Sequence, residues 1–145
     1  VTIAGATEGG VAMENGKMSK GVLLEPGELG RAVEIDASLA GMQKVVGGLI
    51  EPFYPFEEQV CIVCNEESKI NGMRPNRSVK NDDGVMVDFI FGPAFICDCR
   101  GENLDSLSDE QIDRYGKMFR YPEHLARVND TLLGIPYRPQ PERER

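Results

Sequence analysis

The run Val60-Cys61-Ile62-Val63-Cys64 limits the fold of this chain more than any other feature of its sequence. All five side chains are apolar, and three of them are β-branched. Such a run favours a strand and is typical of one that is covered by protein on both faces. With 145 residues the chain has the length of one ordinary domain, so we expect a single core around this central strand.

Five further segments have the residue types of strands and are separated by turn residues. Pro52 places its segment at the edge of the sheet, where no ladder hydrogen bond is lost, and this strand should pair with the central one as a hairpin. Pro26-Gly27 joins the first two strands by a tight turn, and Gly92-Pro93 separates the last two. The predicted strands are residues 22–24, 32–35, 49–54, 85–91 and 94–99.

Three segments have helical spacing. Ser38, or alternatively Asp36, can cap a short helix that Gly47-Gly48 ends. Ser108 and Gln111 form a capping box for a second helix. Residues 122–133 are predicted to be a third, with Pro122 in its first turn and Gly134 as its stop. The expected apolar stripes are Leu39, Met42 and Val46 in the first helix; Ile112, Tyr115, Met118 and Phe119 in the second; and Leu125, Val128 and Leu132 in the third.

These segments predict an α+β fold with a small, mostly antiparallel sheet of five to six strands. A short helix follows the second strand, and residues 104–134 form a helical extension after the sheet core of residues 21–100. Residues 21–135 are expected to be one domain. Residues 1–20, rich in glycine and small side chains, are expected to be a flexible arm, and the proline-rich residues 136–145 a disordered tail.

The chain is acidic, with 24 Asp and Glu against 16 Lys and Arg and a formal net charge of −8. This balance argues against the broad basic face that non-specific nucleic-acid binding requires. The acidic surface could imitate DNA and so occupy a DNA-binding protein. The alternative is that the acidic charge only keeps the protein soluble. No stretch approaches the roughly 20 consecutive apolar residues of a membrane helix, and residues 1–20 lack signal-peptide features. We therefore expect a cytoplasmic protein without membrane contacts.

Four cysteines lie in two close pairs, Cys61 with Cys64 and Cys97 with Cys99. Two thiolate pairs brought together by a fold can form a tetrahedral zinc site. Both pairs fall in predicted strands, however, where residues i and i+3 point to opposite faces of the sheet. We therefore expect small buried thiols and no metal or other cofactor, with a zinc site and thiol redox chemistry as the alternatives.

Residues 65–84 form the longest polar stretch inside the predicted domain. Their turn signals predict a long ordered loop, a feature that often carries function in a compact domain. Arginine presents a planar fork of donors to phosphates and carboxylates. The alternative is a solvated loop whose arginines pair with nearby acids. The residues predicted to bind a partner or ligand are Lys69, Arg74, Asn76, Arg77 and Lys80.

The ordered series of motifs along the chain resembles a known family. Among them are Glu25-Pro26-Gly27, Cys64-Asn65-Glu66-Glu67, Pro75-Asn76-Arg77 and Phe89-Ile90-Phe91-Gly92. From Gly21 to Phe119 this series is similar to the domain of unknown function 3846. The resemblance implies a protein of phages, plasmids and integrated elements, and it implies no catalytic residue.

No catalytic constellation accompanies these motifs. His124 is the single histidine, and it is expected to be a solvated helix residue because no nucleophile motif lies near it. We therefore predict a non-enzymatic binding or inhibitor protein of a mobile element that acts on a host defence or regulatory protein. A binder of a small anionic ligand or nucleotide and a zinc or thiol-redox protein are the alternatives, and a homo-oligomer is an open question.

Overall fold

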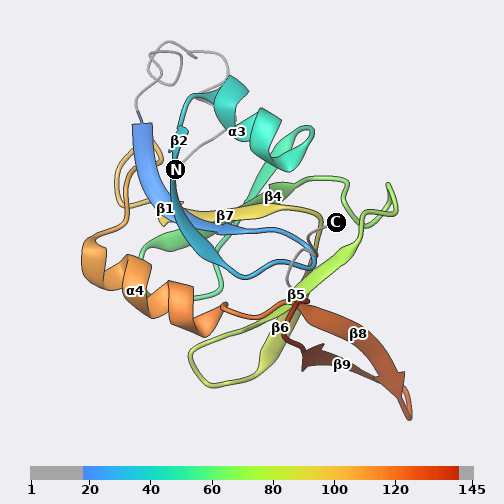
Figure 1. Ribbon diagram of the computed structural model, residues 1–145. Helices are drawn as coiled ribbons and strands as arrows, with labels where there is room; N and C mark the ends of the chain where they lie inside the picture. Colours follow the sequence, from blue (N-terminus) through green and yellow to red (C-terminus); the bar gives the residue numbers. More distant parts are fainter. Residues whose placement is uncertain (1–17, 141–145) are drawn as a thin grey trace.

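The computed structural model describes residues 18–140. Its strands form a five-stranded sheet and two separate hairpins, and all strand pairs are antiparallel (Figure 1). The mostly antiparallel character is confirmed, although the strands divide into three groups where one sheet was predicted. The elements are β1 (Met18–Leu24), β2 (Arg31–Asp36), α3 (Leu39–Val46), β3 (Ile50–Phe53), β4 (Val60–Asn65), β5 (Pro75–Lys80), β6 (Met86–Phe91), β7 (Ala94–Asp98), α4 (Asp109–Met118), β8 (Glu123–Val128) and β9 (Thr131–Pro136).

The five-stranded sheet has the order β2-β1-β7-β4-β3. Residues 60–63 of β4 are 0% exposed, so the prediction of a strand covered on both faces is confirmed. β3 is an edge strand, as its proline predicted. The Glu66 amide donates to the Leu49 carbonyl at 2.9 Å, and the antiparallel alternation then places Pro52 at a non-hydrogen-bonded position opposite Val63. The proline nitrogen therefore faces away from β4, and no ladder bond is lost.

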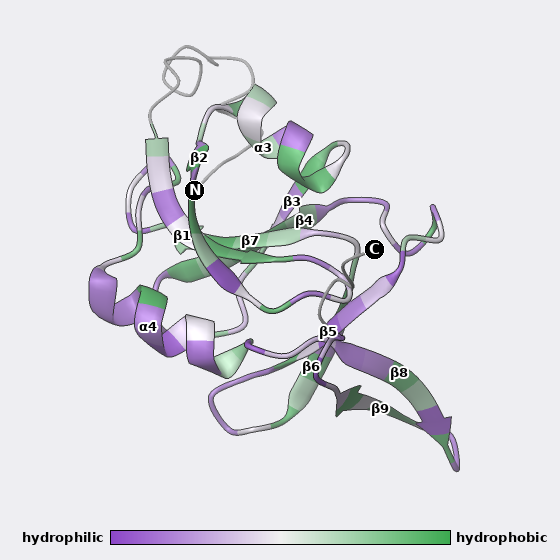
Figure 2. Ribbon diagram, viewed as in Figure 1, coloured by the Kyte–Doolittle hydropathy of each residue, from purple (hydrophilic) through white to green (hydrophobic). Residues whose placement is uncertain are grey.

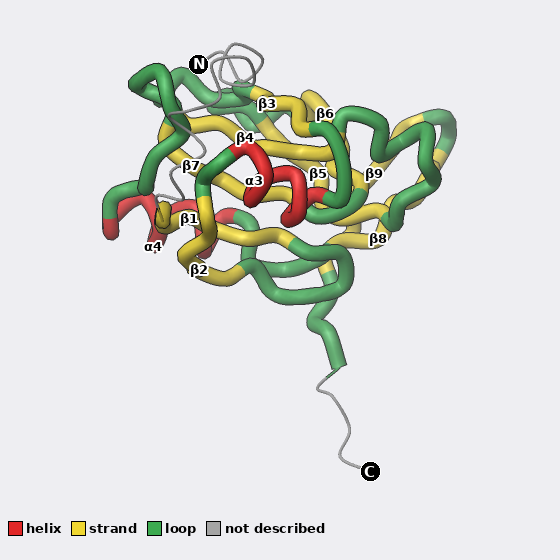
Figure 3. The backbone as a smooth tube through the Cα atoms, turned by 90° about the horizontal axis from the view of Figure 1, so that it is seen from above, coloured by secondary structure: helices red, strands yellow, loops and turns green. Residues whose placement is uncertain are grey.

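The two faces of this sheet carry separate cores, because side chains alternate along each strand. α3 covers one face and lies across the strands in the view from above (Figure 3). The other face packs against α4 and the β5–β6 hairpin. The first core includes Met42, Val46, Cys61, Val63, Phe95 and Cys97, and the second includes Val22, Ile62, Val79, Ile90, Tyr115 and Phe119.

Local capping explains where the two helices begin and end. The Ser38 hydroxyl accepts a hydrogen bond from the Gly41 amide, and Gly47 ends α3 with φ 81°, a conformation that a Cβ would strain. Ser108 and Gln111 form the predicted capping box of α4. Tyr115 and Phe119 are buried as predicted, whereas Met118 lies beside this stripe and is 53% exposed.

The predicted loop of residues 65–84 is wrong at residues 75–80, which form β5 and pair with β6. Asn76, Arg77 and Ser78 are buried polar residues in this strand. Each has hydrogen-bond partners inside the protein, so burial is compatible with their polarity. Their polarity made the segment resemble a surface loop.

The predicted third helix is also wrong, since residues 123–136 form the β8–β9 hairpin. Asn129 and Asp130 join the strands with φ values of 50° and 68°, the signature of a type I′ turn. The helical interpretation overlooked this turn signal. The hairpin projects from the body of the protein below β5 (Figure 1).

Both ends of the described chain differ from the prediction. Residues 18–20 belong to β1 and not to an arm, and Pro136 belongs to β9. The Tyr137 amide continues the ladder by donating to the Pro122 carbonyl at 3.0 Å. The flexibility predicted for residues 1–17 and 141–145 lies outside the described residues. Between residues 18 and 140, the helices are too short or too polar to cross a membrane.

Candidate functional site

The five residues predicted to bind a partner do not share one surface. Asn76 is 0% exposed and Arg77 is 1% exposed, so the expected arginine loop does not exist as a surface. Arg74 and Lys80 are exposed at the two ends of β5. Lys69 lies in the turn before β5.

The Arg77 guanidinium is a structural hub. Its Nε donates to the Phe119 carbonyl at 2.7 Å, and its two terminal nitrogens donate to the carbonyls of Glu25, Glu28 and Arg120 and to the Asn76 side chain. An arginine has five N–H donors, and all five are used here. Burial lowers the pKa of Arg77 to about 10, so the group stays charged at neutral pH. It has no donor left for a ligand.

Asn76 is the second member of this hub. Its Nδ2 donates to the carbonyls of Leu24 and Gly92, at 3.0 Å and 2.8 Å, and its Oδ1 accepts from Arg77. The side chain therefore ties β5 to the end of β1 and to the turn before β7. Asn76 and Arg77 hold separate parts of the fold together.

The four cysteines lie on both faces of the sheet, as the strand geometry predicted. Cys61 lies opposite Cys97 in the β4–β7 pair, with the sulfurs 4.0 Å apart, and Cys99 packs in the same core. Cys64 packs against the other core. Burial raises the pKa of Cys64 to about 12 and that of Cys99 to about 11, and a hydrogen bond to Cys97 with burial raises the pKa of Cys61. Thiolates, the reactive and metal-binding form, are therefore disfavoured at neutral pH.

Within residues 18–140, no group of three or more His, Cys, Asp or Glu side chains is arranged to hold a metal ion. His124 lies on β8 and not on a helix. Its ring stacks on that of Tyr137, with centroids 4.0 Å apart and an interplanar angle of 13°. The histidine is exposed, as expected.

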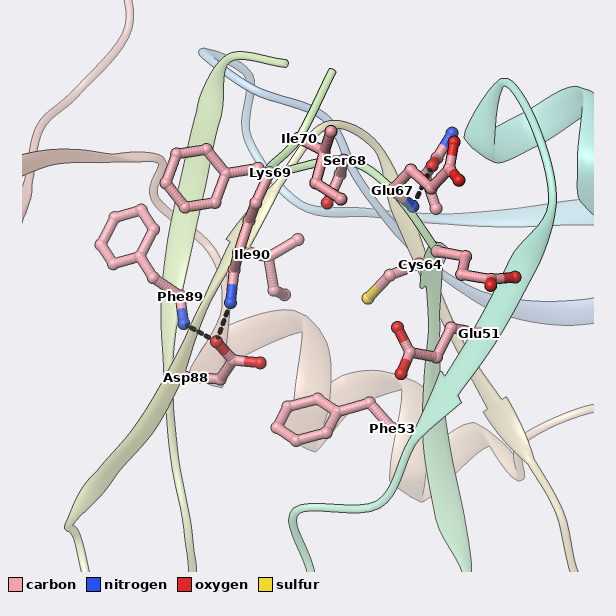
Figure 4. A pocket seen from close by; sticks show the side chains of 13 residues that line it. Glu51, Phe53, Cys64, Glu67, Ser68, Lys69, Ile70, Asp88, Phe89 and Ile90 are labelled. Carbon is pink, nitrogen blue, oxygen red and sulfur yellow. Dashed lines mark hydrogen bonds and ion pairs between the residues drawn. The ribbon is translucent and has the colours of Figure 1, made fainter. Parts of the chain in front are cut away.

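A cavity of about 270 Å³ lies between the edge of the five-stranded sheet and β6, and we call it the β3–β6 pocket. Figure 4 shows the Glu51 carboxylate and the Cys64 thiol pointing into this space from one side. Asp88 and Phe89 come from β6 on the other side. The pocket is lined by Glu51, Phe53, Cys64, Lys69, Asp88, Phe89, Ile90 and Phe91, together with residues 65–68 and Ile70.

The floor of the β3–β6 pocket is apolar. Ile90 belongs to the buried core under the sheet, and Phe53 packs against this core. The rings of Phe89 and Phe91 lie beside each other on β6, with centroids 5.8 Å apart. A ligand in this pocket would therefore contact aromatic and aliphatic surface.

The walls of the β3–β6 pocket are acidic. Lys69 Nζ forms a 2.7 Å ion pair with Asp88, whose same oxygen also accepts from the Phe89 amide. Glu51 is exposed on β3. These charges also act on the Cys64 thiol. After burial, Asp88 and Glu51 contribute most to raising its pKa, and Lys69 lowers it. A negative potential in a pocket favours a cation.

Asn65 organises the loop at the rim of the β3–β6 pocket. Its Nδ2 donates to the Val46 carbonyl at the end of α3, and its Oδ1 accepts from the Glu67 amide at 2.7 Å. The Ser68 amide donates to the Asn65 carbonyl. These hydrogen bonds hold the rim in place, and the one to Val46 is buried.

Two further hollows are lined by three of the remaining predicted residues, whereas Asn76 lines neither and is hydrogen bonded to Arg77. Arg77 and Lys80 together line a hollow of about 330 Å³ near the end of α4, along with Asp82 and Glu123. Arg74 lines a more open hollow beside Pro26. The structure therefore brings Arg77 and Lys80 together and leaves Lys69 and Arg74 apart from them.

The sequence model of one family, the domain of unknown function DUF3846, matches residues 18–120. The chain belongs to this family. Comparison with curated proteins gave no match, and neither did comparison with solved structures. The DUF3846 region includes the β3–β6 pocket and the Arg77 hub, whereas the β8–β9 hairpin follows it.

Sequence reasoning did not single out Glu51, Phe53 or Asp88 as functional residues. Asp88 gave a usable signal, since it is a charged residue inside an otherwise apolar strand of the DUF3846 region. Glu51 and Phe53 flank the edge proline, so they belong to an exposed sheet edge. The convergence of β3 and β6 depends on how the β5–β6 hairpin packs against the sheet, and no local pattern encodes it.

Proposed function

We propose that this DUF3846 protein is a non-enzymatic binding protein whose β3–β6 pocket receives a basic side chain of a partner protein. The observation that carries the proposal is the pair of carboxylates, Glu51 and Asp88, on opposite walls above an apolar floor. Lysine and arginine lay their aliphatic stems along apolar surface and keep the charged head in a polar setting. The pocket offers both environments.

The size of the β3–β6 pocket supports a single side chain as its occupant. Its volume of about 270 Å³ lies below the usual range for drug-sized ligands, which begins at about 300 Å³. Lys69 neutralises part of the acidic charge through Asp88, so the pocket retains a moderate negative field. A cationic group could displace Lys69 from Asp88 or join Glu51.

The alternatives have less support. The small anionic ligand was expected on paired arginines, but Arg77 has all its donors engaged. A zinc or thiol-redox function needs thiolates, but burial raises the pKa values of Cys64 and Cys99, and the hydrogen bond to Cys97 together with burial raises that of Cys61. A binding function requires neither feature.

The class of partner follows from the resemblance. If the DUF3846 family is carried by phages, plasmids and integrated elements, a defence or regulatory protein of the host is the natural target. We place the encounter in the cytoplasm, where the four free cysteines would remain reduced. The partner would present lysine or arginine beside apolar side chains.

Affinity capture from host lysate with charge-reversed variants tests the proposal. Glu51→Lys should reduce recovery of the partner by at least about tenfold, because it places a cation where a cation must bind. Glu34→Lys is the matched control, since Glu34 is exposed on β2 at the opposite edge of the same sheet. A lysine-containing peptide should release the partner, whereas a glutamate-containing peptide should not. Equal recovery with both variants would refute the pocket as the binding site.

A further inference from the structure

We infer that β9 is a self-association surface on which a second copy of this chain pairs antiparallel, edge to edge. The surface lies outside residues 18–120 that match the family, so it is an addition to the DUF3846 domain. It is also separate from the β3–β6 pocket, and its test is independent of what that pocket binds.

The hydrogen-bonding pattern of the hairpin shows which groups of β9 are available. The bond from the Tyr137 amide to the Pro122 carbonyl makes residues 137 and 122 a bonded pair. Bonded pairs recur every second residue, so Ile135 pairs with His124 and Leu133 with Ala126 in this way. The amides and carbonyls of Leu132 and Gly134 then point away from β8. Within residues 18–140, β8 is the strand that pairs with β9, so the outer edge is open.

Charge distinguishes β9 from the other outer strands of the described chain. Exposed edges are normally protected by charged residues or proline. β2 carries Arg31 and Glu34, and β3 carries Glu51 and the outward-facing Pro52. β5, β6 and β8 also contain charged residues. β9 has the sequence TLLGIP, without a charge, and its proline, Pro136, lies at the last position of the strand, beyond Leu132 and Gly134.

The net charge of −8 makes this difference important for self-association. Two copies repel each other wherever their acidic surfaces meet. Pairing through β9 brings together an uncharged strand in each copy, on a hairpin that projects from the acidic body (Figure 1). An uncharged edge with free amides and carbonyls can pair with another such edge, and a second copy of this chain presents an identical one.

The outward face of the hairpin is apolar as well. Val128, Leu133 and Ile135 share this face and are 48%, 40% and 47% exposed. Figure 2 shows hydrophobic residues on β9 and on part of β8, whose other residues are hydrophilic. The opposite face turns toward β5 at the base of the hairpin, where Glu123 accepts hydrogen bonds from Ser78. Pairing would extend the apolar face across two copies and bury part of it.

The free groups define a symmetric register. Leu132 of one copy lies opposite Gly134 of the other, and each of the two equivalent pairs exchanges both hydrogen bonds. Leu133 then faces Leu133 of the second copy across the two-fold axis. The result is an isologous contact that joins two hairpins into one four-stranded sheet. The small interface predicts a dissociation constant on the order of 100 μM.

Sedimentation equilibrium of the full chain tests this inference, from about 5 μM to about 1 mM to bracket the expected constant. The wild type should change from monomer to dimer across this range. Leu133→Lys places like charges opposite each other at the axis and should weaken the dimer at least about tenfold. Val87→Lys is the matched control, because Val87 is 45% exposed on β6 and the charge change is the same. It should dimerise like the wild type.

Amide exchange of the wild type provides a second measurement that does not depend on a variant. The Leu132 and Gly134 amides should become protected as the concentration rises. A wild type that remains monomeric throughout, or a dimer that both lysine variants leave unchanged, would overturn the inference. A dimer without added protection at these two amides would also overturn it.

Discussion

Arg77 donates a 2.7 Å hydrogen bond from its Nε to the carbonyl oxygen of Phe119, the residue that caps the C-terminal end of α4. This end of a helix carries a partial negative charge, which suits a buried cation. The same guanidinium reaches the carbonyls of Glu25 and Glu28 in the turn between β1 and β2. One side chain on β5 therefore joins the β5–β6 hairpin to the β1–β2 turn and to the end of α4.

Arg77→Met should cost about 3 kcal/mol of unfolding free energy, because methionine fills similar space but donates none of the five hydrogen bonds that Arg77 makes. Urea unfolding monitored by circular dichroism measures the change. Arg74→Met, at an exposed position three residues earlier, should change stability by less than about 0.5 kcal/mol. Equal effects of the two substitutions would contradict the role of Arg77 as a hub.

The Arg77 hub shows why sequence analysis reached the fold more readily than the site. The run at residues 60–64 predicted a central strand and Pro52 predicted an edge strand, each from local sequence alone. Both predictions are confirmed. A polar stretch with arginines is compatible with two structures. It can be a solvent-exposed loop, or a buried segment whose polar groups are all hydrogen bonded inside the protein. The carbonyls that satisfy Arg77 lie 42 to 52 residues away in sequence, so the choice depends on tertiary structure.

Glu58 provides a second link to α4 and predicts a pH dependence. Its carboxylate accepts hydrogen bonds from Arg114, Tyr115 and Gln111, and the bonds from Arg114 and Tyr115 contribute most to lowering its pKa from 4.5 to about 2. A lowered folded-state pKa stabilises the protein above pH 4.5, and this contribution is lost as the pH falls toward 2. Since Glu58 is 35% exposed, solvent screening reduces it to about 1 kcal/mol.

Glu58→Gln should therefore destabilise the protein by about 1 kcal/mol at pH 7, and by progressively less between pH 4.5 and pH 2. Urea unfolding at a series of pH values measures this difference. Glu57→Gln, at the neighbouring exposed position, should follow the wild type. A difference between Glu58→Gln and the wild type that stays constant down to pH 2 would show that the ion pair is not its cause.

The thiols should be inert in the folded protein. Burial raises the pKa values of Cys64 and Cys99, and Cys61 is 0% exposed beside Cys97. Reaction with a thiol reagent at pH 8 should be at least about 100-fold slower for the native chain than for the chain in guanidinium chloride. Rapid reaction of two or more thiols, or a stoichiometric zinc ion in the purified protein, would contradict this interpretation.

The β8–β9 turn predicts a stabilising substitution. Asn129 and Asp130 both have positive φ, and Asn-Gly is the preferred pair for such a turn. Asp130→Gly should raise stability by about 0.5 kcal/mol by relieving the strain. Asp83→Gly is the control, because Asp83 does not have positive φ. Differential scanning calorimetry should show a higher unfolding temperature for the first variant and no gain for the second.

The hairpin also shows the limit of helical periodicity. Leu125, Val128 and Leu132 recur at helical spacing, yet they belong to two strands. Six cross-strand residue pairs and the packing of β8 on β5 stabilise the hairpin. The Asn129-Asp130 turn was the local signal that distinguished the two structures.

A titration of ¹⁵N-labelled protein with N-acetyl-lysine methylamide, followed by amide chemical shifts, tests most directly whether the β3–β6 pocket binds a basic side chain. Saturable shifts should appear at the amides of Glu51, Phe53, Asp88 and Phe89, and they should be lost in Glu51→Gln combined with Asp88→Asn. N-acetyl-glutamate methylamide should leave these amides unchanged. Equal shifts with both compounds, or no shifts around the β3–β6 pocket, would contradict a site for a basic side chain.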